Sequence, residues 1–180
     1  MRMISEIVYR LRGVTSTKKL IEQGMKVGKN FQRMSGVLID DSHAWLIEIG
    51  DNVTLAPRVH ILAHDASTKM FLGYTKIGRV TVGSNVFVGA ETVILPGVAI
   101  GDNVIIGANS TVTHDVPSGA VVAGTPAKVL CSLDEYLSKE KARMMKSPCY
   151  DASYTLRGSI SSEMKEKQKR ELSGQIGYVE

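Results

Sequence analysis

The strongest constraint in this sequence is a period of six residues that begins at Val82 and continues without a gap to Pro117. The first position of each unit is a β-branched aliphatic residue: Val82, Val88, Ile94, Ile100, Ile106 and Val112. The fifth position is small or branched: Val86, Thr92, Val98, Val104, Ser110 and Val116. A helix would place apolar residues at steps of three and four. An ordinary strand would alternate by two and reach a turn every 8–12 residues. The period therefore indicates a different repeating structure.

Glycine at the second position suggests what that structure is. Gly83, Gly89, Gly101 and Gly107 each follow an aliphatic residue, and after three of them an Asn stands two positions later. These residue types tolerate the backbone dihedrals of sharp bends. Three short strands joined by bends close a triangular coil, and coils stack at the usual strand spacing of about 4.8 Å. Each aliphatic ladder then fills a continuous core, which explains how the chain manages with three Phe and one Trp.

The same register extends upstream from about Val27, although it lapses around residues 33–46. It breaks after His64 and is expected to resume at Ile77, so that residues 65–75 form an inserted loop. Long loops in regular scaffolds are often functional. Helical patterns flank the repeat on both sides. The predicted organisation is an all-β solenoid between helices: an N-terminal helical segment 1–26, a β-helix of about five coils 27–131, and a C-terminal helical extension 132–180.

Composition excludes several classes of protein. No run approaches the roughly 20 apolar residues of a membrane span. The two cysteines form no disulfide framework or four-cysteine zinc site, which favours a reducing cytoplasmic setting. No basic stripe interleaved with aromatic residues suggests nucleic-acid binding. The first thirteen residues are amphipathic and basic, so they are expected either to plug the end of the coil or to touch an anionic membrane surface.

With its closing stretch AGTPAKVL (residues 123–130), the repeat resembles the hexapeptide-repeat acyltransferases. Within that family it is most similar to maltose and galactoside O-acetyltransferases and to polysaccharide-associated O-acetyltransferases. The resemblance implies a left-handed parallel β-helix and a homotrimer with active sites between subunits. It also implies transfer of an acetyl group from acetyl-CoA to a sugar or glycan hydroxyl, with no metal.

His64 is the candidate catalytic residue. Acyl transfer to a hydroxyl needs a group that accepts the proton, and imidazole suits this task near neutral pH. His64 stands where the repeat breaks, and in the resembling transferases a histidine at this place acts as general base. The group that orients it stays open between the carboxylates of Asp40, Asp41 and Asp65 and a backbone carbonyl.

The resemblance also carries over candidate binding residues, position by position. The acetyl-CoA candidates are Ala90, Ala108, Thr113, His114 and Lys128. The acceptor candidates are Ser35, Asp41, Trp45 and Asp65. His114 departs from the usual lysine of the family, and Lys128 stands where relatives usually carry arginine.

Three other functions remain as alternatives. The acyl acceptor could be an amino sugar or the hydroxyl of serine. His60 and His64 could belong to a zinc enzyme of the γ-carbonic anhydrase type, although a third ligand has no obvious candidate. A β-helix can also be a non-catalytic assembly module.

Overall fold

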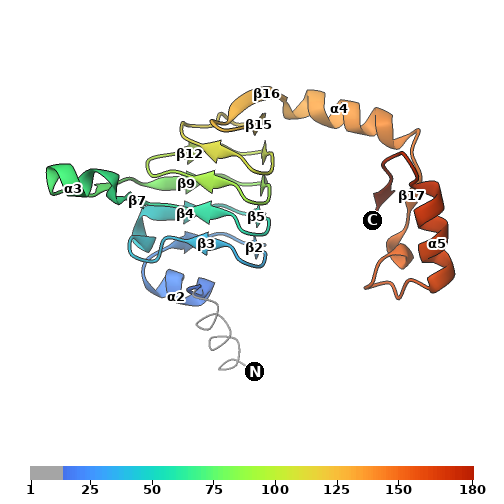
Figure 1. The fold of residues 1–180 in the computed structure, drawn as a ribbon, viewed down its shortest axis with the longest axis horizontal. Helices are drawn as coiled ribbons and strands as arrows, with labels where there is room; N and C mark the ends of the chain where they lie inside the picture. The colour runs from blue at the N-terminus through green and yellow to red at the C-terminus, as the bar shows by residue number, and fades with distance from the viewer. Residues whose placement is uncertain (1–13) are drawn as a thin grey trace. The chain divides into compact units, whose positions relative to one another are not determined.

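The computed structural model describes residues 14–180, and its repeat folds into three parallel sheets around one interior (Figure 1). One sheet contains β1 (Lys26–Val27), β4 (Ile47–Ile49), β9 (Val80–Val82) and β12 (Ala99–Ile100). Another contains β2 (Gln32–Arg33), β5 (Thr54–Leu55), β10 (Val86–Val88), β13 (Val104–Ile106) and β15 (Ala120–Ala123), closed by antiparallel β16 (Lys128–Ser132). A further sheet contains β3 (Leu38–Ile39), β6 (His60–Ile61), β11 (Val93–Ile94) and β14 (Thr111–Val112).

The strand register gives the length of one coil. Val88 pairs with Ile106, eighteen positions further along the chain. Leu55 pairs with Val88, thirty-three positions further, because the insertion adds fifteen residues to that coil. The chain therefore visits the three sheets in turn and returns to the first, as three sixfold units per coil require.

The predicted first-position ladder points into the core, and the fifth-position residues form a second buried ladder. The first-position residues from Val82 to Val112 are at most 3% exposed, and the fifth-position residues from Val86 to Val116 are at most 6% exposed. The two polar members, Thr92 and Ser110, donate their hydroxyls to the carbonyl of Gly107. Burying an aliphatic side chain of this size contributes roughly 1.5–3 kcal/mol, so the ladders are the main source of stability in this unit.

Glycine and asparagine do different work at the corners. The asparagines adopt positive φ: Asn85 has φ 57° and Asn103 has φ 58°. Gly83 needs no such angle, but a Cβ there would lie 2.7 Å from the carbonyl carbon of Gly101 in the next coil. Glycine was expected at the bends for its unusual backbone dihedrals. At Gly83 the reason is different: the backbones of adjacent coils approach too closely for a side chain.

The insertion is an ordered excursion from the coil. It comprises β7 (His64–Asp65), η2 (Ala66–Thr68), α3 (Lys69–Leu72) and β8 (Lys76–Ile77). β7 and β8 pair antiparallel, and Lys76 Nζ lies 2.6 Å from Asp65 Oδ2. The prediction that the inward pattern resumes at Ile77 is wrong: Ile77 is 59% exposed in β8, and the buried ladder resumes at Val80. The antiparallel pairing with β7 keeps Ile77 outside the coil.

At the N-terminal side, α2 (Thr17–Glu22) buries Leu20, and the chain then enters β1. A short turn, η1 (Ala44–Leu46), connects β3 to β4. The basic segment predicted to plug the coil or touch a membrane, residues 1–13, lies outside the described residues.

The chain divides into two compact units, Met1–Leu133 and Asp134–Glu180. α4 (Leu133–Met144) begins at that boundary, and the second unit also contains η3 (Ala152–Tyr154), α5 (Ser162–Glu171) and the parallel pair β17 (Cys149–Tyr150) and β18 (Tyr178–Val179). Tyr150 Oη donates to Glu171 at 2.9 Å, and Tyr178 Oη donates to Glu140 at 2.9 Å. Both cysteines are free, and no helix in residues 14–180 is long and apolar enough to cross a membrane.

Candidate active site

A histidine–carboxylate pair lies at the start of the insertion. Asp40 follows β3, and His64 lies in β7, twenty-four residues later in the chain. Parallel pairing of β3 with β6 brings the two ends of these strands together. His64 Nδ1 is in direct hydrogen-bond contact with Asp40 Oδ2. This contact selects Asp40 among the carboxylates that the sequence left open.

The Asp40 carboxylate is held rigidly. Its side chain is 2% exposed. Ser42 Oγ donates to Oδ1 at 2.7 Å, and the backbone N–H of Ala63 donates to Oδ2 at 3.0 Å. Burial alone would raise the pKa of Asp40. The hydrogen bonds from Ser42, His64 and Ala63 outweigh burial and hold this pKa below its usual value.

The contact with Asp40 fixes what His64 can do. A carboxylate only accepts hydrogen bonds, so Nδ1 carries the proton and Nε2 of a neutral ring is the nitrogen with a free lone pair. The His64 side chain is 37% exposed. An oriented, partly exposed imidazole with one free basic nitrogen is the arrangement that general-base catalysis needs.

A cavity of about 210 Å³ adjoins this pair. Its walls come from the segment before α2, from β3 and β6 with the residues that directly follow them, and from β7. The lining residues are Val14, Thr15, Leu38, Ile39, Asp40, Asp41, Ser42, Ile61, Leu62 and His64. Thr15 Oγ1 donates to Asp41 Oδ2 at 2.5 Å. Arg33 donates to the carbonyls of Thr15 and Val37 at 2.8 and 2.7 Å and thereby holds this wall in place. Polar oxygens and aliphatic surface together suit a small polyhydroxylated molecule.

The structure separates the predicted acceptor residues. Asp41 lines the cavity beside His64, whereas Ser35, Trp45 and Asp65 do not line it. Asp65 instead pairs with Lys76 and accepts the N–H of Ser67, and these contacts lower the pKa of Asp65 to about 2. Trp45 is 57% exposed, and its ring lies 5.2 Å from that of His43.

The predicted acetyl-CoA residues lie on later coils of the same unit. Ala90 and Ala108 follow β10 and β13, and Asn109 N donates to the Ala90 carbonyl at 2.7 Å. Thr113 Oγ1 and His114 Nδ1 are 2.8 Å apart. Lys128 is exposed at the start of β16. None of these five residues lines the cavity beside His64.

Sequence reasoning missed Thr15, Ser42 and His43. Thr15 and Ser42 line the cavity, and the ring of His43 lies 5.2 Å from that of His64. Ser42 and His43 directly follow the Asp40–Asp41 pair, so their position next to two candidate carboxylates was the available signal. His60, the other histidine considered for a metal pair, lies in β6 and is not part of the Asp40–His43–His64 group.

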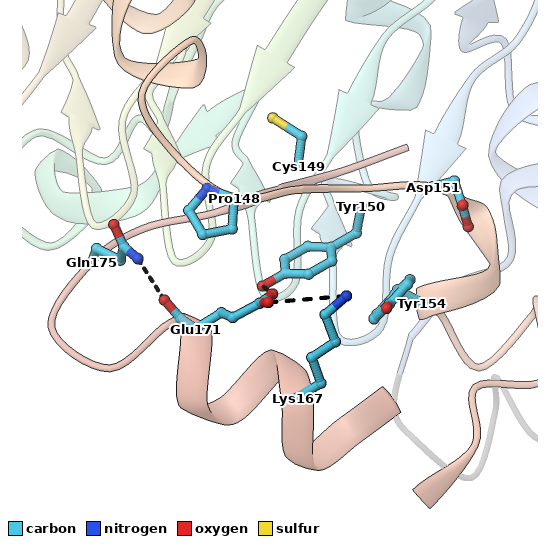
Figure 2. Close-up of a pocket in the computed structure, with 8 residues that line it drawn as sticks. All are labelled: Pro148, Cys149, Tyr150, Asp151, Tyr154, Lys167, Glu171 and Gln175. Carbon is cyan, nitrogen blue, oxygen red and sulfur yellow. Dashed lines mark hydrogen bonds and ion pairs between the residues drawn. The ribbon is translucent and has the colours of Figure 1, made fainter. Parts of the chain in front are cut away.

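A second pocket lies in the C-terminal unit, with a volume of about 500 Å³. Figure 2 shows Tyr150 and Lys167 directed toward the carboxylate of Glu171. The rings of Tyr150 and Tyr154 are 4.8 Å apart. The charges of Lys167 and Glu171 offset each other, and no histidine lines the pocket, so it lacks the oriented imidazole found beside the first cavity.

Comparison with known proteins places the chain in a family. Residues 79–114 match the family model for bacterial transferase hexapeptide (six repeats). Protein CapG of Staphylococcus aureus is 41% identical over 69% of this chain and 75% of its own length. A solved galactoside acetyltransferase in complex with coenzyme A has a TM-score of 0.57, with 35% identity over 64% of this chain and 58% of that one. A maltose O-acetyltransferase from Clostridium difficile 630 has a TM-score of 0.53, with 37% identity over 61% and 59%.

The fold and the comparisons together define a class of proteins built on a parallel β-helix of hexapeptide repeats. This chain belongs to the hexapeptide-repeat family of bacterial transferases, which confirms the predicted resemblance. Membership implies the left-handed coil that the family shares. The chain spans less than two thirds of the length of the two solved acetyltransferases.

Proposed function

We propose that this protein transfers the acetyl group of acetyl-CoA to a hydroxyl of a sugar or glycan precursor, with His64 as general base. The observation that carries the proposal is the contact between His64 Nδ1 and the buried carboxylate of Asp40. It is supported by the resemblance to galactoside and maltose O-acetyltransferases, one of them in complex with coenzyme A.

The reaction balances without a covalent enzyme intermediate. His64 Nε2 accepts the hydroxyl proton while the hydroxyl oxygen attacks the thioester carbonyl. The tetrahedral intermediate collapses, the carbon–sulfur bond breaks, and the imidazolium returns the proton to the departing thiolate. Asp40 stabilises the imidazolium that forms between these steps, because a carboxylate beside a cation favours its charged form.

The acceptor is assigned to the cavity beside His64. Asp41 is the polar group for a sugar hydroxyl, because its Oδ2 already accepts a hydroxyl hydrogen bond from Thr15. A donor hydroxyl on a sugar can replace or join that contact. Leu38, which also lines the cavity and is 39% exposed, offers aliphatic surface to a sugar ring.

Acetyl-CoA is assigned to the later coils of a neighbouring subunit in a homotrimer. Small residues at Ala90 and Ala108 let the pantetheine arm lie close to the backbone. Thr113, His114 and Lys128 would meet the phosphates, since cationic and hydroxyl groups bind phosphate well. Lys128 is exposed and therefore accessible to such a ligand.

An acceptor screen tests this function. The protein is incubated with acetyl-CoA and, in separate reactions, galactosides, maltose, other sugars, glucosamine and serine. We expect thiol release and the mass gain of one acetyl group on a neutral sugar. Acetylation confined to the amine of glucosamine or to serine would overturn the assignment of a sugar hydroxyl. Absence of thiol release with every acceptor would contradict acetyl transfer itself.

A further inference from the structure

Three side chains of the kinds that bind zinc converge beside the cavity. Asp40, His43 and His64 each offer one ligand atom, and these atoms lie within 4.8 Å of one another. Two imidazoles and one carboxylate form a ligand set that Zn²⁺ commonly uses, with a fourth position left for water. The zinc pair considered from the sequence, His60 and His64, had no candidate for a third ligand. The structure supplies a different group, in which His43 takes the place of His60.

His43 provides a second, independent observation. Its Nδ1 is buried and has no hydrogen-bond partner among residues 14–180. Leaving a buried polar atom without a partner is destabilising, so its persistence needs an explanation. The ring lies 5.2 Å from His64 on one side and 5.2 Å from Trp45 on the other. A cation coordinated by the His43 ring would supply an interaction that no described residue provides.

The surroundings of Asp40 resemble the outer shell of a metal site. Ser42 Oγ and the Ala63 N–H hold the two carboxylate oxygens in fixed directions. Outer-shell hydrogen bonds of this kind orient metal ligands and raise affinity. One ionised carboxylate with two neutral imidazoles also offsets part of the charge of a divalent cation.

The required movement is small. Bonds of about 2.0–2.1 Å in a tetrahedral site place ligand atoms roughly 3.3 Å apart. The candidate ligand atoms already lie within 4.8 Å of one another, so reaching that spacing needs shifts of about 1–2 Å or less, with the direct His64–Asp40 contact widening slightly. Side-chain rotation can supply this, because His64 and His43 are only partly buried.

We propose that Asp40, His43 and His64 form a Zn²⁺ site, and that zinc there prevents His64 from acting as general base. The two uses of His64 exclude each other, since zinc removes His64 from its contact with Asp40 and occupies a ring nitrogen. Zinc is therefore an inhibitor of the enzyme and not a cofactor of the reaction. The inhibition rests on the proposed function, whereas the binding does not.

Calorimetric titration of the full chain with Zn²⁺, after treatment with a chelator, tests the site. We expect one ion per chain and an affinity reduced by about tenfold or more in His43→Ala and in Asp40→Asn. His60→Ala is the matched control, because it removes an imidazole outside the group, and it should bind as the unaltered protein does. Binding that is absent, or that falls equally in His60→Ala, would overturn the proposal.

Trp45 gives a second readout that locates the ion. It is the only tryptophan and its ring lies beside His43, so Co²⁺ bound at the site should quench its fluorescence. The quenching should disappear in His43→Ala and persist in His60→Ala. Unaltered quenching in His43→Ala would place the metal elsewhere and contradict the site. Circular dichroism confirms that each variant is folded.

Inhibition is then measured as thiol release with and without Zn²⁺ within each variant. We expect zinc to suppress turnover of the unaltered protein and to lose that effect in His43→Ala. Binding at the site without inhibition of an active enzyme would overturn the exclusion of His64. If no acceptor supports turnover, the proposed function fails, but the titration still decides whether the metal site exists.

Discussion

At the scale of single residues, Asp40 and Asp65 offer a direct contrast. Both carboxylates are near His64 in the chain or in space, but only Asp40 contacts the imidazole, while Asp65 pairs with Lys76. Replacing Asp40 by Asn removes the charge that stabilises the imidazolium and lets the ring adopt the wrong tautomer. We expect Asp40→Asn to lower kcat about a hundredfold or more, with little change in KM for acetyl-CoA.

Asp65→Asn tests the other carboxylate under the same assay. It breaks the contact with Lys76 and leaves Asp40 and His64 in place, so kcat should stay within about twofold. A large loss of kcat in Asp65→Asn with none in Asp40→Asn would show that the wrong carboxylate has been assigned.

The proposed base, His64, could be singled out from the sequence, whereas its carboxylate partner could not. His64 is marked by the break in the sixfold pattern. The sequence does not distinguish Asp40, Asp41 and Asp65 as partners of His64. The pairing of β3 with β6 decides which carboxylate reaches the His64 imidazole. The orphan Nδ1 of His43 is likewise a property of three-dimensional surroundings and leaves no mark in the sequence.

At the scale of elements, the corners of the coil are stabilised by an asparagine ladder. Side-chain amides link Asn30 to Asn52, Asn52 to Asn85 and Asn85 to Asn103 at 2.9, 2.9 and 3.1 Å. The same residues have positive φ, which costs other side chains roughly 1–2 kcal/mol. Asparagine therefore supplies both the turn and a bond between coils.

Two substitutions of Asn85 separate these contributions. Asn85→Gly keeps the turn and loses the amide bonds, whereas Asn85→Ala loses both. We expect the free energy of unfolding to fall by about 1 kcal/mol for glycine and by about 2 kcal/mol for alanine. Denaturant titration measures both, and an alanine variant as stable as the glycine variant would contradict the role of φ.

Glu48 gives β4 a pH-dependent link to its neighbours. Its carboxylate contacts Lys26 of β1 and Arg79 beside β9, and these contacts lower the pKa of Glu48. The stabilisation is present above the unfolded pKa and is lost as pH falls through the lower folded value. We expect the Tm of Glu48→Gln to fall less steeply than that of the unaltered protein between about pH 5 and pH 3. If Tm falls equally steeply with pH in Glu48→Gln and in the unaltered protein at low salt, this link is contradicted.

The regular coils were predictable because each sixfold unit repeats the same local physics. The sequence predicted that the repeat is interrupted after His64, but it did not predict the structure of the inserted residues. Nothing in the period indicates that Lys76 and Ile77 pair with Asp65 and His64, because antiparallel pairing depends on how the chain returns from α3. The composition of the C-terminal segment predicted helices, but not the parallel pairing of β17 with β18.

At the scale of the whole molecule, the proposed site requires more than one chain. The cavity beside His64 contains no residue from the predicted acetyl-CoA set, and the proposed function assigns that set to a neighbouring copy. Exposed apolar side chains at Met70, Phe71 and Leu72 of the insertion are available to pack against another surface. We expect light scattering to give about three times the 19.5 kDa of one chain. A monomer that retains full turnover would contradict a shared site.

The most direct test of the account is turnover of His64→Ala with a chemical substitute for the lost ring. Removing the base should lower thiol release by about 10²- to 10⁴-fold, with the trimer and coenzyme binding retained. Free imidazole can enter the cavity that the truncated side chain enlarges, so added imidazole should restore a measurable part of the rate. Thiol release by His64→Ala at the rate of the unaltered protein, without imidazole, would contradict the assignment of His64 as general base.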